Sequence, residues 1–277
     1  MTEAQPAVWS GKAVINAVWV ATKEPDDWIV ARLDALFDAV TESLGVGRWQ
    51  ASSGARWAGS PADKAAVVRS FAATDPFVDP EPGAGVTFTV SGAGDRVGLH
   101  VRVSAGSDTL GRRIPLHTLG IELRNMVPGG VDTTVGDTLV AAVAEHWRPA
   151  VVTLADLDLI RAARRGGWKV DFGYRVWLAP EVGSIGPVAT GADIAQLAGG
   201  TLIAVPDDWP AQQVVDEMHD RFVSLVAKGR NLDESAVRPL ADGRILTARQ
   251  ALAARFVDEI GYWDDAVRRT AQLVGAP

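Results

Sequence analysis

Few residues in this 277-residue sequence have the types and spacing that catalysis or metal binding requires. The four histidines are His100, His117, His146 and His219. None of them is spaced with another histidine or an acid as metal ligands usually are, and no HExxH motif occurs. No Gly-x-Ser-x-Gly turn presents a serine nucleophile, and the absence of cysteine excludes thiolate chemistry and disulfides. We therefore expect no catalytic residue, no bound metal and no cofactor.

Two glycine-rich stretches, residues 83–85 and 91–95, resemble fragments of phosphate-binding loops. Neither continues into the Gly-Lys-Ser/Thr sequence that opens a helix beneath a nucleotide. Both lie beside alternating apolar residues, which is the pattern of a strand. We interpret them as turns beside strands rather than as a nucleotide site.

Acidic residues occur in pairs, and one pair follows an apolar stretch. The pairs at positions 26–27 and 264–265 precede helical periodicity, where carboxylates cap the first amides of a helix. Asp207 and Asp208 instead follow a buried type of strand and adjoin Trp209. One explanation is that they cap the next helix, and the other is that they form a loop that binds a partner. The second explanation makes Asp207, Asp208 and Trp209 the candidate binding residues.

The composition is that of a soluble globular protein, with 47% hydrophobic and 22% charged residues. A net charge of −7 disfavours direct binding to nucleic acid and favours a cationic partner. The N-terminal residues lack a basic stretch followed by an apolar one, and no apolar run is long enough to span a bilayer. We expect a cytoplasmic protein that contacts neither membrane nor nucleic acid.

Hydrophobic periodicity predicts an α+β domain over residues 1–209, with helices packed on a mixed or antiparallel sheet. Strands are expected at 13–22, 86–90, 97–103, 148–154, 174–179 and 201–205, and helices near 24–44, 61–72, 135–146 and 155–165. Residues 114–123 are expected to add an edge strand, because Pro115 lacks the amide hydrogen that a central strand needs. The run at 201–205 is apolar almost throughout, which predicts burial on both faces.

From residue 210 onward the pattern is helical only. A long amphipathic helix starts at Pro210, and three shorter ones are expected near 233–239, 247–256 and 262–274. We therefore place a domain boundary near residue 209, followed by a helical tail at 210–277.

The first domain resembles the Immunity protein 52 family of bacterial polymorphic toxin systems over about residues 16–209. Four short stretches carry the resemblance: AVWVAT at 17–22, EHWRP at 145–149, GYRVWL at 173–178 and GGTLI at 199–203. In the third, the tyrosine and tryptophan stand in altered order. The resemblance implies a small non-catalytic α+β fold that neutralises a nuclease toxin by binding it.

The tail resembles the C-terminal end of signal-peptide-peptidase-A-type serine peptidases over about residues 214–273. The matching stretches are FVSLV at 222–226, GR at 229–230, LADGRI at 240–245, TARQA at 247–251, VDEIG at 257–261 and DA at 265–266. Residues 183–186, Gly-Ser-Ile-Gly, are similar to another short motif of these enzymes. The resemblance implies a serine nucleophile in an upstream Gly/Ser-rich turn, served by a lysine base. The sequence contains no such turn, and its five lysines have no matching context.

These observations favour a non-enzymatic immunity protein that binds a cognate toxin, a cationic nuclease, with its acidic charge steering the association. We accordingly expect no hydrolytic activity. The alternative is a divergent or catalytically dead serine peptidase of the clp/crotonase-like fold, which a serine within hydrogen-bond reach of a lysine would favour. A third hypothesis is an assembly protein whose helical tail holds a homo-oligomer together.

Overall fold

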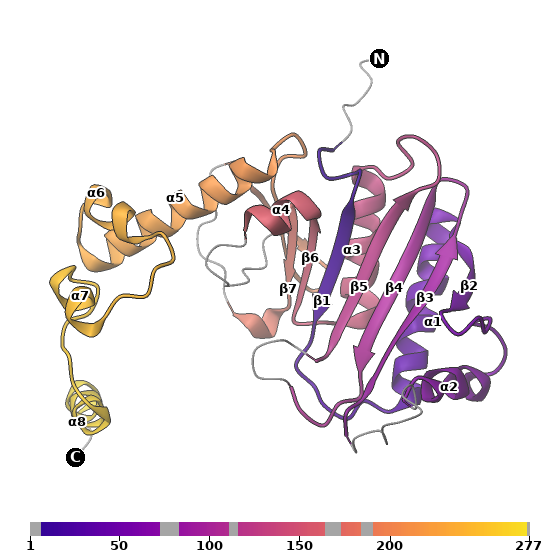
Figure 1. The fold of residues 1–277 in the computed structure, drawn as a ribbon, viewed down its shortest axis with the longest axis horizontal. Helices are drawn as coiled ribbons and strands as arrows, with labels where there is room; N and C mark the ends of the chain where they lie inside the picture. Colours follow the sequence, from indigo (N-terminus) through magenta and orange to yellow (C-terminus); the bar gives the residue numbers. More distant parts are fainter. Residues whose placement is uncertain (1–6, 73–82, 111–115, 164–172, 184–190, 276–277) are drawn as a thin grey trace. The chain divides into compact units, whose positions relative to one another are not determined.

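The computed structural model describes residues 7–72, 83–110, 116–163, 173–183 and 191–275. These described residues form two compact units, one extending to Val215 and one beginning at Asp216. The first unit carries helices on an antiparallel sheet, and the second is helical (Figure 1). The predicted fold class, α+β with a helical C-terminal tail, is confirmed.

The described residues of the first unit contain nine strands. They are β1 (Ala13–Val18), β2 (Gly47–Ala51), β3 (Val86–Ala93), β4 (Val97–Ala105), β5 (Thr118–Asn125), β6 (Val151–Asp156), β7 (Arg175–Leu178), β8 (Asp193–Leu197) and β9 (Gly200–Ala204). Their order in the sheet is β2-β3-β4-β5-β1-β6-β7-β9-β8, and all neighbours are antiparallel. Alternation sets the two faces: Val101 and Val103 of β4 are buried, whereas Arg102 between them is exposed.

The described helices of the first unit are α1 (Asp26–Leu44), α2 (Pro61–Ser70), α3 (Thr133–Trp147) and α4 (Leu157–Ala162), with a 3-10 turn, η1 (Pro180–Val182). Helices α1 and α3 cover one face of this sheet (Figure 1), while α2 packs against α1 and α4 against β6. The end of α1 is set by Gly45, which adopts φ 66° and donates its amide hydrogen to Thr41 O. Glycine reaches this left-handed conformation without the steric cost of a Cβ atom, which is why helices so often stop there.

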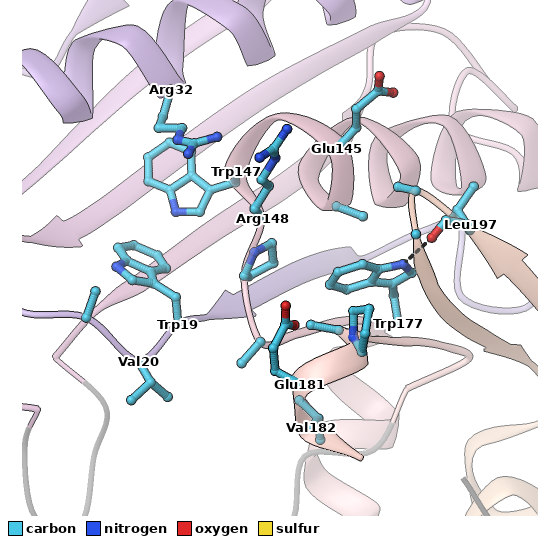
Figure 2. Close-up of a pocket in the computed structure, with 18 of the residues that line it drawn as sticks. Trp19, Val20, Arg32, Glu145, Trp147, Arg148, Trp177, Glu181, Val182 and Leu197 are labelled. Carbon is cyan, nitrogen blue, oxygen red and sulfur yellow. Dashed lines mark hydrogen bonds between the residues drawn. The ribbon is translucent and has the colours of Figure 1, made fainter. Parts of the chain in front are cut away.

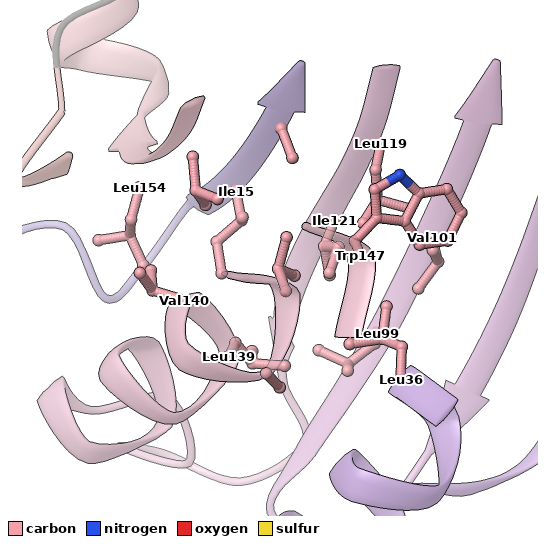
Figure 3. Packing of buried hydrophobic residues seen from close by; sticks show 14 of the residues in the cluster. Ile15, Leu36, Leu99, Val101, Leu119, Ile121, Leu139, Val140, Trp147 and Leu154 are labelled. Atoms are coloured by element: carbon pink, nitrogen blue, oxygen red, sulfur yellow. The ribbon is translucent and has the colours of Figure 1, made fainter. Parts of the chain in front are cut away.

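The main core lies between the sheet and helices α1 and α3 (Figure 3). Its central side chains are Ile15, Leu36, Leu99, Val101, Leu119, Ile121, Leu139, Val140, Trp147 and Leu154, all buried. They come from β1, β4, β5, β6, α1 and α3, so one continuous cluster fixes the positions of strands and helices far apart in the sequence.

Gly136 near the start of α3 provides a test of this packing. A Cβ atom added there would lie 2.5 Å from the Trp9 ring and 3.1 Å from a Leu154 methyl group. Gly136→Ala should therefore destabilise the protein by about 1–3 kcal/mol, because overpacking outweighs the helix propensity of alanine. In α5 (Ala211–Arg230), Gly229→Ala is the matched control, since nothing lies within 4 Å of the added atom. It should be neutral or stabilising by up to about 1 kcal/mol in urea unfolding, and equal effects at both sites would contradict this packing.

Three expectations about strands require correction. The strand at β5 is central, between β4 and β1, rather than at an edge; Pro115, on which that expectation rested, lies outside the described residues. Strands β2 and β8 were not predicted, because neither alternates cleanly between apolar and polar residues. Strand β9 is mostly half-buried rather than buried on both faces, since only the exposed strand β8 separates it from the sheet edge.

The second unit is a set of helices around a small core. It contains most of α5, followed by α6 (Glu234–Val237), the 3-10 turn η2 (Arg238–Leu240), α7 (Ala248–Ala253) and α8 (Trp263–Val274). Its buried core consists of Val223, Ala227 and Val237. The compact second unit begins at Asp216, because Val214 and Val215 at the start of α5 belong to the main core. The domain boundary near residue 209 stays a prediction.

None of the described helices is both long enough and apolar enough to cross a membrane.

Candidate functional site

The predicted binding residues lie where β9 leads into α5, and one of them, Asp207, accepts several hydrogen bonds. Its carboxylate accepts hydrogen bonds from Arg175 (Nη2–Oδ1 2.8 Å), the Thr133 hydroxyl (Oγ1–Oδ2 2.6 Å) and the Trp9 indole (Nε1–Oδ1 3.3 Å). Its backbone oxygen accepts from the amide of Val8 at 3.0 Å. Asp207 therefore ties the N-terminal segment and α3 to the end of the sheet.

Arg175 is the buried cation at this junction, with 5% of its surface exposed. Besides Asp207, it donates from Nε to Asp137 Oδ1 at 2.7 Å and from Nη1 to the backbone oxygens of Tyr174 and Val205, each at 3.0 Å. Burial acts to lower the pKa of the guanidinium, but Asp137 and Asp207 outweigh it and raise that pKa above its ordinary value. The group is therefore charged, and its hydrogen bonds join β7 to the exit of β9.

The other two predicted residues differ in exposure. Asp208 is exposed, whereas Trp209 is partly buried against the main core with its ring against Gly191. Binding of a partner by Asp207, Asp208 and Trp209 stays a prediction. Sequence reasoning did not find the hydrogen-bond partners of Asp207. The one available signal was Arg175, a charged residue inside an apolar strand.

In the second unit, an arginine residue joins α5 to the segment after α7. Arg230 donates to both oxygens of Asp258, at 3.1 and 2.7 Å, and from Nε to the backbone oxygen of Arg255 at 2.8 Å. Arg230 and Asp258 both belong to the stretches that resemble serine peptidases. These stretches therefore contact one another between the end of α5 and the segment after α7.

The Ala-Asp-Gly-Arg and Thr-Ala-Arg-Gln stretches form two local motifs. The Arg244 side chain hydrogen-bonds Asp242 (Nε–Oδ1 2.7 Å), and this contact lowers the pKa of Asp242 to about 2. Thr247 and Gln250 form a reciprocal capping box at the start of α7, in which each side chain accepts from the other residue's amide. Gly243, within the first of these motifs, adopts φ 83°, a conformation that glycine reaches without strain.

A hollow of about 610 Å³ opens beside these motifs, within the second unit. Its apolar lining includes Phe222, Val226, Val237, Leu246 and Phe256. It contains no paired nucleophile and base among the residues that line it, so its chemistry is that of apolar contact.

The described residues contain neither a hydrogen-bonded serine–lysine pair nor a cluster of side chains that could bind a metal ion. Within it no serine hydroxyl is hydrogen-bonded to a lysine amine, and Lys64 is paired with Asp34 at 2.8 Å. Likewise, none of the described His, Asp and Glu side chains gather in groups of three or more that could hold a metal ion. Of the Gly-Ser-Ile-Gly motif, residues 184–186 lie outside the described residues.

Comparison with known proteins supports the resemblance of the C-terminal segment to serine peptidases. The profile of Peptidase family S49 matches residues 210–276. A protein of Enterococcus faecium, provisionally named signal peptide peptidase SppA, is 54% identical over 56 residues, which are 20% of this chain and 16% of that protein. A provisionally named protease of Synechocystis sp., slr0021, is 45% identical over 64 residues, 23% of each chain. Protease 4 of Haemophilus influenzae is 34% identical over 94 residues, 32% of this chain and 15% of that protein.

The chain thus spans less than a quarter of the length of each of these relatives. Among solved structures, the Pseudomonas aeruginosa T6SS protein PA0821 aligns over 70% of this chain and 66% of its own, at 10% identity and a TM-score of 0.37. A likeness this weak supports no inference about fold or function.

The expectation of a non-enzymatic immunity protein and toxin inhibitor was wrong. The family match and the relatives named as proteases point to a peptidase, and none of them supports Immunity protein 52. The physical reason is that the stretches behind that resemblance follow local geometry. In GGTLI, Gly199 adopts φ 78° in the turn before β9, and a Cβ atom on Gly200 would lie 2.5 Å from the Trp177 ring. Residues that a tight hairpin requires carry little information about family.

The expectation of no hydrolytic activity rested on the missing nucleophile turn. That argument fails because the matches to the relatives named as proteases cover only 16% and 23% of those proteins, so the larger part of each relative has no matched counterpart in this chain. Residues 210–276 are similar to Peptidase family S49, and this is the functional assignment that the comparisons support.

Proposed function

We propose that this chain is part of an S49-type serine peptidase. Its helical second unit packs against the part of that enzyme that carries the catalytic residues, which we call the catalytic body. The observation that carries the proposal is the agreement between the matched residues, 210–276, and the compact unit that begins at Asp216. The reaction is hydrolysis of peptide bonds, with a serine nucleophile and a lysine base provided by the body. That body lies on the same polypeptide or on a second one.

Unpartnered apolar surface on the second unit supports this role. Large apolar side chains that remain substantially exposed are Phe222, Leu225, Ile245, Ile260, Tyr262, Trp263, Val267, Leu273 and Val274. Among its described residues, the unit buries three completely enough to form a core. Because exposed apolar patches of this kind mark interaction surfaces, a unit with so small a core is suited to packing against a larger body.

Helix α8 shows the same feature most clearly. Trp263 is 79% exposed, Tyr262 before it is 88% exposed, and α8 has no buried residue. Trp263, Val267 and Val274 are spaced four and seven residues apart, which places them along one side of the helix. A helix of 12 residues gains little stability without tertiary packing, so this apolar side is expected to dock on another surface.

The test is to isolate the protein, with an affinity tag, under native conditions from the cells that encode it. A serine-directed fluorophosphonate probe should then label one serine, either in this chain or in a polypeptide that stays bound to it. The double variant Tyr262→Asp, Trp263→Asp removes the apolar contact and should lose the labelled species, whereas Asp264→Asn leaves the apolar side unchanged and should retain it. A soluble, intact isolate with no labelled serine would contradict the proposal.

A further inference from the structure

Tryptophan side chains line a hollow in the first unit (Figure 2). It has a volume of about 1030 Å³, at the upper end of the range for small-molecule sites. It lies where the segment after β1, helix α1, the end of α3, the segment of β7 and η1, and the turn between β8 and β9 meet. The four tryptophans of the lining are Trp19, Trp28, Trp147 and Trp177.

These aromatic walls are held by contacts within the protein. The Trp147 ring lies 5.3 Å from Trp19 and 5.7 Å from Trp28, centroid to centroid, the latter pair at 82°. The Trp177 indole donates to Leu197 O at 2.8 Å, and the Trp19 indole donates to the Glu24 carboxylate. Fixed aromatic surfaces lose little conformational entropy when a ligand packs on them, so the hollow is preorganised for an apolar body.

Two arginines give one side of this hollow positive charge. Arg32 places its guanidinium 5.3 Å from the Trp28 ring centre and donates from Nη1 to His146 O at 2.7 Å. Burial, followed by the charge of Arg148, lowers the pKa of Arg32, so the two cations are close enough to repel. Figure 2 shows both guanidinium groups near Trp147. Within the described part of the chain, no carboxylate forms an ion pair with either arginine.

The backbone at Arg148 is also unusual. It adopts φ 51° at the end of α3, a left-handed conformation that costs a non-glycine residue about 1 kcal/mol or more. The sequence nevertheless places an arginine there, beside the hollow, where glycine or asparagine would be less strained.

An unsatisfied donor lies in the same lining. Trp147 is only 1% exposed, and its indole N–H is buried without a hydrogen-bond partner among the described residues. Most buried polar atoms in proteins are hydrogen-bonded, so this N–H lacks, among the described residues, the partner that such a donor usually has. The two arginines, which form no ion pair with a described carboxylate, favour a negatively charged oxygen acceptor in the hollow.

We propose that this hollow binds a small ligand with an aromatic or aliphatic body and a single carboxylate. The body packs on the tryptophans, and the carboxylate lies beside Arg32 and Arg148. The exposed acids Glu145 and Glu181, which also line the hollow, disfavour a ligand with further negative charges such as a phosphate ester. Because every residue involved belongs to the first unit, this inference does not depend on the proposed peptidase role.

Free aromatic acids and the C-terminal residue of an apolar peptide share this chemistry, and two probes distinguish them. The probes are 4-phenylbutyrate and N-acetyl-Leu-Phe, each compared with its own primary amide by titration calorimetry of the full chain. We expect one or both carboxylates to bind with a Kd below about 1 mM and the matching amide at least about 10-fold more weakly. The tighter of the two carboxylates identifies the source. Absence of binding by both, or equal binding of acid and amide, would overturn the proposal.

Variants at Arg148 separate charge from folding. Arg148→Asn removes the charge but tolerates the left-handed backbone, so it should fold and weaken binding at least about 10-fold. Arg148→Lys keeps a positive charge and should bind within about 5-fold of the native chain. Arg124→Gln, on an exposed residue of β5 outside the hollow, is the matched control and should bind unchanged. Unchanged affinity in a folded Arg148→Asn variant would place the ligand elsewhere and overturn the assignment.

Discussion

Replacing Arg175 with methionine is expected to lower the free energy of unfolding by about 3–5 kcal/mol. Arg175 is nearly fully buried and supplies hydrogen bonds to two carboxylates and two backbone oxygens. Methionine fills much of the same volume but donates nothing, so the oxygens of Tyr174 and Val205 lose their side-chain donor inside the protein. Asp137 and Asp207 are more exposed than Arg175 and recover part of their loss through water.

Urea unfolding monitored by tryptophan fluorescence measures this change. Arg124→Met is the matched control, because Arg124 is exposed and its contact with Glu122 spans 3.9 Å. Its effect should stay within about 0.5 kcal/mol of the native chain. If Arg175→Met were equally mild, the junction formed by Arg175 and Asp207 would not be part of what stabilises the sheet.

Glu24→Gln is the second substitution with a large expected effect, and its effect depends on pH. Glu24 is 8% exposed and accepts hydrogen bonds from the Trp19 indole and, at 2.9 Å, from the Gly106 amide. Its Oε1 also lies 3.0 Å from His117 Nδ1, while His117 Nε2 lies 3.0 Å from Thr109 O. Loss of the charged acceptor should cost about 2–3 kcal/mol at pH 7.

The sign of the pH dependence follows from the pKa of Glu24. Burial acts to raise this pKa, but the bonds from Trp19 and Gly106 and the charge of His117 outweigh it, so the folded-state pKa lies below the ordinary value of 4.5. The ionised carboxylate therefore stabilises the fold fully above about pH 4.5, and this stabilisation is lost as the pH falls below that value through the folded-state pKa.

Unfolding of native chain and Glu24→Gln should accordingly differ most near neutral pH and converge in acid. Glu122→Gln is the control, because the Glu122 side chain is 59% exposed and should show little difference at any pH. A gap between native and Glu24→Gln that widened below pH 4.5 would contradict an ionised Glu24 in the folded state.

Elements with strong local signals could be predicted from the sequence. Helix α1 follows from two acids at its start, an apolar stripe and the glycine that ends it. The hairpin of β3 and β4 follows from clean alternation on both sides of a glycine-rich turn. The peptidase-like segment was recognisable because its motifs are short and contiguous.

Features that depend on distant residues could not be predicted in this way. The partners of Asp207 lie 32, 74 and 198 residues away, so no local pattern distinguishes this carboxylate from a helix cap. Strand β8 has mostly exposed residues and owes its place to pairing with β9. The hollow is assembled from five separate segments, and the sequence indicated only that tryptophan is abundant.

Transplantation of residues 210–276 into a relative tests the proposed peptidase role most directly. In the chimaera, these residues replace the matching segment of Haemophilus influenzae Protease 4, and hydrolysis of a fluorogenic peptide is compared with the parent. The account predicts a kcat/KM within about 10-fold of the parent, a change of about 1.4 kcal/mol. Adding Trp263→Asp to the chimaera should lower it by a further 30-fold, about 2 kcal/mol, if α8 docks through its apolar side. A soluble chimaera that unfolds cooperatively but is no more active than the parent without its segment would contradict the account.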